Sequence, residues 1–229
     1  MLYEFMDKYI WHDFAKDIIQ YTNKEYKSPI VVFDVGCFIG NFSRKIKKKF
    51  PEGSFYLFDP NPNLKINDFK HYKLALSNSV KKRIYYLNNF FPGGGSSLSP
   101  NGKNDFFWNL SRKIITLKFW KGYSEHEVDS ATLDNFCEEN KVKHIDILKI
   151  DVDGSELEVL QGGDKILNKV KIALVEVNDT KNNFEEKFVQ VKNLLEKKYN
   201  FKLVKQKKMW SVSIFSNLKV VDTLFVKME

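Results

Sequence analysis

Cysteine and long apolar runs are scarce in this sequence. Its 229 residues include two cysteines, Cys37 and Cys137, which are too few for a disulfide framework and are not spaced like zinc ligands. The longest apolar runs, at 30–33 and 172–175, fall far short of the roughly 20 residues that a membrane span needs. The first residues do not have the basic start and apolar run of a signal peptide. We therefore expect a protein of the reducing cytoplasm without a transmembrane segment.

Acidic residues are fewer than basic ones. The chain has 37 lysines and arginines against 29 acidic residues, a net charge of +8. Basic residues cluster at 44–49 and again in six lysines at 197–208. A solvated basic surface explains this pattern. The alternative is a field that attracts a polyanion, such as a nucleotide diphosphate, a nucleic acid or an acidic membrane. Charge does not choose between these interpretations.

Short β-branched runs alternate with amphipathic segments along most of the chain, and this alternation is typical of an α/β domain with a mainly parallel sheet. The predicted strands are 30–35, 54–58, 72–76, 145–150, 171–177 and a closing hairpin of 201–204 and 210–215. Predicted helices cover 2–21, 42–50, 62–69, 133–137, 155–161 and 184–195. We predict one domain over 1–229, with an N-terminal helix in 1–25. A β-rich insertion over 80–130 includes strands at 83–87 and 113–119.

A glycine loop follows the first predicted strand, between Asp34 and Gly40. Glycines at Gly36 and Gly40 permit a tight turn and let a ligand approach the backbone. The loop is neither the dinucleotide fingerprint nor a phosphate-binding P-loop. An acidic residue at its start suits a ligand with a cationic amino-acid end. Alternatively, the glycines only make a turn.

Asp59 ends the second predicted strand, 19 positions beyond Gly40. This is close to the spacing at which an acidic residue binds a ribose in nucleotide-binding sheets. The alternative is an N-cap of the helix that we predict from Pro62.

Asp151 ends the fourth strand of the predicted sheet, and Asp153 and Glu156 follow it. The first and fourth strands are neighbours where a doubly wound sheet reverses its order, and ligands bind there. We therefore expect Asp151 and the Asp34 loop to line one crevice. Helix capping by Asp153 or Ser155 would explain one of these polar residues but hardly all of them.

With these motifs the chain resembles the FkbM family of S-adenosylmethionine-dependent methyltransferases over about residues 30–180. The segments that carry the resemblance are Asp34 to Gly40, Asp59 to Pro62, Ala75-Leu76, Gly95 to Leu98, Thr132 to Asp134 and, most specifically, Ile145 to Gly162. Asp153 departs from the glutamate usual in the family. The resemblance implies a Rossmann-like class I fold with a seven-stranded sheet and helices on both faces.

The resemblance also implies roles for individual residues. The backbone of Gly36 and Cys37 would hold the methionine end of the cofactor, Asp59 its ribose, and Ala75 and Leu76 its adenine. We assign the full cofactor site to Asp34, Gly36, Cys37, Gly40, Asn41, Asp59, Asn61, Ala75, Leu76, Ser97 and Asp151. The loop 93–97 is predicted to close over the site, because its glycines permit movement without strain.

Methyl transfer from a sulfonium needs alignment of the acceptor and help in removing the hydroxyl proton. We assign that chemistry to Asp151, Glu176 and Asn178. An oxygen-ligand magnesium site formed by Asp151 and Glu176 with Asn178 or Asp179 is the alternative; no metal ligand is assigned. S-adenosylhomocysteine would be the product.

The acceptor that we expect is a sugar hydroxyl, carried on a nucleotide or lipid diphosphate or part of a surface glycan, because the basic charge suits an anionic carrier. A nucleic-acid methyltransferase is the competing enzyme. The sequence has no separate RNA-binding module, so we expect no nucleic-acid partner. A non-catalytic cofactor-binding scaffold is the alternative from another class. The sequence does not indicate the oligomeric state.

Overall fold

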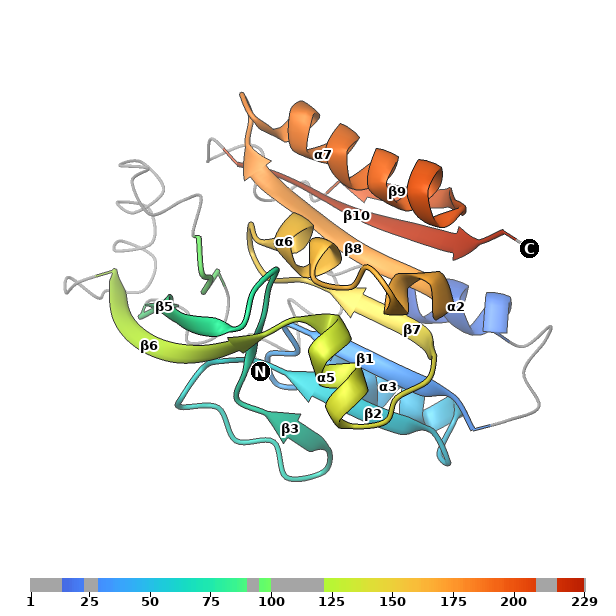
Figure 1. Cartoon of the computed structure of the whole chain (residues 1–229), viewed down its shortest axis with the longest axis horizontal. Helices are drawn as coiled ribbons and strands as arrows, with labels where there is room; N and C mark the ends of the chain where they lie inside the picture. The colour runs from blue at the N-terminus through green and yellow to red at the C-terminus, as the bar shows by residue number, and fades with distance from the viewer. Residues whose placement is uncertain (1–13, 23–28, 90–94, 100–121, 209–217, 229) are drawn as a thin grey trace.

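A computed structural model of the chain describes residues 14–22, 29–89, 95–99, 122–208 and 218–228 (Figure 1). It confirms the α/β class. Seven strands form one mainly parallel sheet in the order β3-β2-β1-β7-β8-β10-β9. None of the described helices is long and apolar enough to cross a membrane.

The centre of the sheet is built from the most apolar runs of the sequence. Strand β1 (Val31–Val35) pairs in parallel with β2 (Ser54–Phe58) on one side and with β7 (Ile145–Ile150) on the other. Strand β8 (Val170–Thr180) continues the parallel arrangement beside β7. Because β-branched side chains fit a strand that is buried on both faces, these runs predict the central strands correctly.

Antiparallel pairing closes one edge of the sheet. Strand β10 (Leu218–Lys227) lies between β8 and β9 (Phe201–Lys208) and runs antiparallel to both. The last strand in the chain thus occupies an inner position. At the other edge, β3 (Lys70–Tyr72) pairs with β2.

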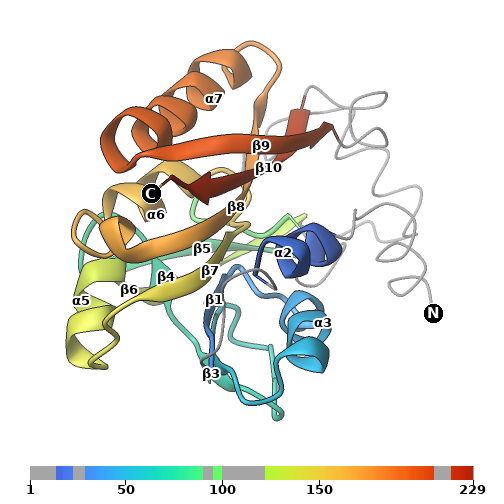
Figure 2. The same cartoon turned by 90° about the vertical axis from the view of Figure 1, so that its right-hand side faces the viewer.

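Helices cover both faces of the sheet (Figure 2). On one face α2 (Phe14–Thr22) and α3 (Asn41–Lys49) pack over a core that includes Val32, Leu174 and Leu224. On the other face lie α5 (Leu133–Glu139), α6 (Glu156–Gln161) and α7 (Phe184–Asn193), which continues into a π-helical turn, Leu194–Lys198. Their core includes Phe33, Leu148 and Phe225.

A second sheet has the order β4-β6-β5. It combines β4 (Ala75–Leu76) with β5 (Lys81–Asn88) and β6 (Tyr123–Ala131), and the last two pair antiparallel along their length. The prediction of a strand at 83–87 is confirmed. Strand β6 was not predicted, and the strand predicted at 113–119 lies outside the described residues.

Some predicted elements differ from the structure. The strand predicted at 72–76 is divided in the structure, because β3 ends at Tyr72 in the large sheet and β4 begins at Ala75 in the second sheet. The helix predicted over 62–69 is wrong, because these residues form turns and bends. The Asp59 carboxylate accepts the amide of Asn61, and the Asn61 side chain accepts the amide of Asn63, so side chains take up the amides that would start a helix. The closing strand predicted at 210–215 lies outside the described residues, whereas β10 at 218–227 was missed.

Candidate active site

The loop after β1 is folded tightly against the end of β7. Gly36 has φ +72°, and a Cβ there would lie 1.7 Å from the carbonyl oxygen of Asp151. The amides of Gly36 and Cys37 both donate to the carbonyl oxygen of Phe58, at 2.9 and 3.1 Å. Glycine is therefore required at position 36 by backbone conformation and by space. The predicted convergence of the Asp34 loop with Asp151 is found in the structure.

Lys149 connects the carboxylates of this crevice. Its ammonium lies 3.2 Å from the Asp34 carboxylate and 3.0 Å from that of Asp151, and it donates to the Gly36 carbonyl at 3.1 Å. Burial opposes the charge, but Asp151 and Asp34 outweigh it and hold the pKa of Lys149 above its ordinary value. All three donors of the ammonium are used. Lys149 lies within a motif segment, but sequence reasoning gave it no role.

Asp34 is fully buried. Its other oxygen accepts a hydrogen bond from Ser43 of α3 at 2.7 Å. The carboxylate thus joins β1, β7 and the helix that follows the loop. Asp34 therefore stabilises the loop through its contacts with Lys149 and Ser43.

Asp59 lies at the end of β2, beneath the loop, and is 5% exposed. One oxygen accepts the amide of Phe38 and the other that of Asn61, both at 3.0 Å. Burial raises the pKa of Asp59 to about 6 against these hydrogen bonds. Since no helix follows Pro62, the N-cap interpretation is wrong. Each oxygen keeps a second lone pair for a ligand.

The other residues assigned to the cofactor surround this crevice. Gly40 has φ +81°, and Asn41 begins α3 beside the Arg44 guanidinium, which donates to its side-chain oxygen at 3.4 Å. Ala75 and Leu76 are buried in β4. The Ser97 hydroxyl donates to the Val152 carbonyl at 3.0 Å, so this residue contacts the turn after β7. Gly93 and Gly94 of the predicted closing loop lie outside the described residues.

Cys37 and Tyr85 are buried close to Asp59. Burial, and secondarily Asp34 and Asp59, raise the pKa of the Cys37 thiol well above its ordinary value, so the thiol stays neutral. Tyr85 of β5 is 4% exposed. Burial, followed by the charge of Asp59, raises the pKa of its hydroxyl, which also contacts Ser96. Sequence reasoning missed Tyr85, because its place depends on how the second sheet folds over the crevice.

The acidic residues after β7 have different surroundings. Asp151 pairs with Lys149, whereas Asp153 accepts a hydrogen bond from Asn178 at 3.1 Å. Glu156 is fully buried and lies 3.0 Å from the Lys187 ammonium of α7. Glu156 and Lys187 therefore form an ion pair that connects α6 with α7 and has a structural role. Within the described parts of the chain, no group of three or more His, Cys, Asp or Glu residues could hold a metal ion, so the magnesium alternative gains no support.

Glu176 lies in β8, directly opposite Asp222 of β10. Glu176 is 8% exposed. Burial raises the pKa of Glu176 well above its ordinary value, and the charges of Asp151, Asp222, Asp153 and Glu156 add to this effect. Asp222 was missed by sequence reasoning, because β10 itself was missed.

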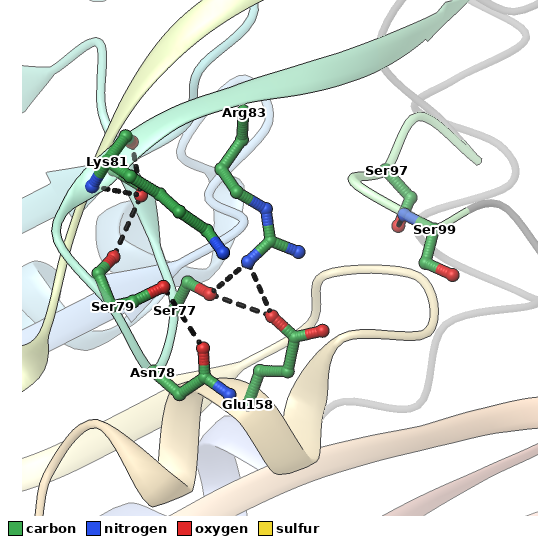
Figure 3. Close-up of polar contacts among 9 residues, drawn as sticks. Ser77, Asn78, Ser79, Lys81, Arg83, Ser97, Ser99 and Glu158 are labelled. Carbon is green, nitrogen blue, oxygen red and sulfur yellow. Dashed lines mark hydrogen bonds and ion pairs between the residues drawn. The ribbon is translucent and has the colours of Figure 1, made fainter.

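A small polar cluster fixes the second sheet to α6. The guanidinium of Arg83 donates to the Ser77 hydroxyl and to the Glu158 carboxylate, both at 2.9 Å, and Ser77 donates to the same carboxylate at 2.8 Å (Figure 3). Ser77 directly follows the buried Ala75–Leu76 pair of β4. The cluster therefore holds β4 and β5 against the helix that begins just after the Asp151 turn.

Comparison with known proteins identifies the family. Residues 34–203 match the profile described as Methyltransferase FkbM domain. Methyltransferase sdnD of Sordaria araneosa is 30% identical over 71% of this chain and 69% of its own length. The 2-O-methyltransferase NoeI of Sinorhizobium fredii is 25% identical over 65% of this chain, which spans 63% of NoeI. The crystal structure of methyltransferase FkbM from Methylobacillus flagellatus aligns with TM-score 0.46 and 10% identity, covering 85% of this chain and 43% of that one.

Proposed function

This chain belongs to the FkbM family of S-adenosylmethionine-dependent methyltransferases, and we propose that it methylates a hydroxyl group of a sugar that a nucleotide or lipid diphosphate carries or that belongs to a glycan. The cofactor supplies an electrophilic methyl group on a sulfonium. The protein has to hold the two substrates in line and to accept the hydroxyl proton.

The crevice between β1, β2 and β7 fits the cofactor. Because Gly36 has no side chain, the loop after β1 packs directly against the Asp151 carbonyl and brings the ends of β1 and β7 together at this crevice. Asp59 would hold the ribose through its remaining lone pairs. The amides of Gly36 and Cys37, which we expected at the methionine end, already donate to the Phe58 carbonyl. Ala75 and Leu76 offer buried apolar surface for the adenine. Asp34, which is paired with Lys149, would position the loop. Asp151, which is paired with the same lysine, would be the carboxylate nearest the reacting atoms.

Two observations support a hydroxyl acceptor on an anionic carrier. The relative NoeI is named as a 2-O-methyltransferase. The net charge of +8 suits an acceptor that an anionic group carries. The observation that carries the proposal is the match of 34–203 to the family, combined with the crevice that residues of this range form.

The test is transfer of a labelled methyl group from S-adenosylmethionine to a panel of nucleotide sugars, read by mass spectrometry. We expect a mass gain of one methyl on at least one sugar and none on its nucleotide. Methylation of RNA but of no sugar would contradict the proposal, and so would tight cofactor binding without any turnover.

The variant Asp151→Asn adds a residue-level test. If Asp151 acts on the acceptor hydroxyl, turnover falls by roughly 10²–10⁴ while cofactor affinity, measured by calorimetry, changes little. A loss of affinity with turnover preserved at saturation would assign Asp151 to cofactor binding instead. The variant Glu186→Gln, on the exposed surface of α7, is the control and should match the wild type in both measurements.

A further inference from the structure

Three carboxylates, those of Asp151, Glu176 and Asp222, lie side by side across three neighbouring strands, one residue beyond the last paired residue of β7. Val35 pairs with Ile150, and Ile150 pairs with Val175, so Gly36, Asp151 and Glu176 follow in line. Asp222 lies opposite Glu176. Neighbouring strands are about 4.8 Å apart. Glu176 is thus about one strand spacing from Asp151, and Asp222 about two.

These side chains point to the same face of the sheet. Residues directly opposite in an antiparallel pair share a face, and alternate residues along a strand return to it. Leu174 lies two positions before Glu176, and Leu224, its antiparallel partner, lies two positions after Asp222. Both leucines are buried in the core beneath α2 and α3. The carboxylates therefore lie next to the apolar core of this face, beside the Gly36 loop.

Neither carboxylate of the pair has a partner within the described residues. Asp151 is neutralised by Lys149, whose three donors are all engaged. Glu176 and Asp222 make no hydrogen bond or ion pair in the described part of the chain. Two like charges directly opposite destabilise a sheet, and burial of the Glu176 carboxylate without a partner adds a desolvation cost. No structural gain within the described residues offsets this cost, which indicates a ligand.

We propose that Glu176 and Asp222 form the acceptor-binding floor of this methyltransferase and that they hold a pair of neighbouring sugar hydroxyls beside the methyl group. This inference rests on the proposed function and names the residues that recognise its substrate. Burial raises the pKa of Asp222 to about 7, with the charge of Asp151 adding to it and Lys149 and Lys207 opposing it. Burial also raises the pKa of Glu176 well above its ordinary value, so the two facing carboxyls favour sharing one proton over carrying two charges. One carboxyl then donates and the other accepts, which matches two hydroxyls that can each do both.

The position of the pair also fits the reaction. The acceptor oxygen forms its new bond to the methyl carbon while the bond from that carbon to sulfur breaks and the electron pair stays on sulfur. The hydroxyl proton passes to the ionised carboxylate of the pair. Atoms and charge balance, since the sulfonium becomes a neutral thioether and one carboxylate becomes a carboxylic acid.

The test measures acceptor binding apart from turnover. Calorimetry with the protein saturated in S-adenosylhomocysteine compares UDP-glucose, UDP-galactose and GDP-mannose, each against a deoxy analogue that lacks one of two adjacent hydroxyls. We expect at least one sugar to bind and its deoxy analogue to bind at least tenfold more weakly. Asp222→Asn and Glu176→Gln should each weaken the sugar tenfold or more and leave the affinity for S-adenosylhomocysteine unchanged. Glu186→Gln is the control.

The outcomes separate the two proposals. The acceptor floor is overturned if the wild type binds none of the sugars, if the deoxy analogues bind equally well, or if both variants bind like the wild type. A sugar that binds through this pair but receives no methyl group supports the floor and contradicts the proposed function. Circular dichroism of both variants confirms that these near-isosteric changes leave the fold intact.

Discussion

Asp59 is the residue whose charge conflicts most clearly with its surroundings among the groups assigned to the cofactor. It accepts two backbone amides, and yet burial raises its pKa to about 6 from an ordinary value of 3.8. A ligand that donates hydrogen bonds to this carboxylate would stabilise the ionised form. The buried charge of Asp59 thus destabilises the folded protein at neutral pH, and ligand binding can offset this cost.

The pH dependence of stability should show this cost. Because the folded-state pKa of Asp59 is raised, its contribution is fully present below about pH 4 and is lost as the pH rises through about 6. The variant Asp59→Asn does not titrate. We expect its free energy of unfolding, relative to the wild type, to increase by roughly 2–3 kcal/mol between pH 4 and pH 7.5, without cofactor.

Urea unfolding at a series of pH values measures this difference. Asp68→Asn is a control of opposite sign, because the hydrogen bond from Arg44 lowers the pKa of Asp68. Its relative stability should fall slightly over the same range. A wild-type minus Asp59→Asn difference that is constant with pH would show that Asp59 carries no such cost.

At the scale of elements, sequence patterns correctly predicted the strands and turns whose conformation depends on their own residues. The runs at β1, β2, β7 and β8 are apolar on both faces and have few alternatives to a central strand. The glycine at position 36 likewise predicted the tight turn after β1 correctly. The helix predicted over 62–69 failed because two side chains, Asp59 and Asn61, compete for backbone amides, and periodicity does not reveal that competition.

Tertiary pairing determines the elements that sequence could not locate. The segment 210–215 and β10 both contain strand-forming residues, and the pairing of β10 with β8 and β9 is not evident from its own sequence. Asp222 was therefore invisible as a site residue. Tyr85 and Lys149 were missed for the same reason, since their roles depend on segments distant in the sequence. The assigned roles of the predicted site residues, and the single domain over 1–229, stay predictions.

The link between β5 and α6 can be measured by a double-mutant cycle. Arg83 and Glu158 are 18% and 32% exposed and share Ser77 as a third partner. We expect a coupling free energy of about 1–2 kcal/mol from Arg83→Met, Glu158→Gln and the double variant. Lys82, the neighbour of Arg83 in β5, and Glu127 of β6 form the matched control, because their side chains are 67% and 59% exposed.

Chemical denaturation of all variants gives both cycles. The control pair should couple by well under 1 kcal/mol, since solvent screens it. Equal coupling in the two cycles would mean that the Ser77 cluster does not hold the second sheet to α6.

At the scale of the whole molecule, the cofactor should stabilise the folded state, because its proposed site exists only when β1, β2 and β7 are assembled. At a concentration one hundred times its dissociation constant, the gain is about 2.7 kcal/mol. For a chain of 229 residues this corresponds to a rise in Tm of roughly 5–10 °C.

Differential scanning fluorimetry with S-adenosylmethionine or S-adenosylhomocysteine measures the rise. Asp59→Ala should need at least tenfold more cofactor for the same shift, since it loses a charge-assisted hydrogen bond worth about 1.5–3 kcal/mol. The same dose response in the variant and the wild type would remove Asp59 from the site.

The inner position of β10 has a consequence for how the protein assembles. Strand β9 precedes β10 in the chain but lies outside it in the sheet, so β9 cannot complete its pairing until β10 has inserted beside β8. The strands of the proposed cofactor crevice can associate earlier along the chain. A folding intermediate that lacks β10 would therefore hold the methyl donor without Asp222. Such a species could bind the reactive cofactor yet remain inert, so that the ability to modify an acceptor arises only with the last strand.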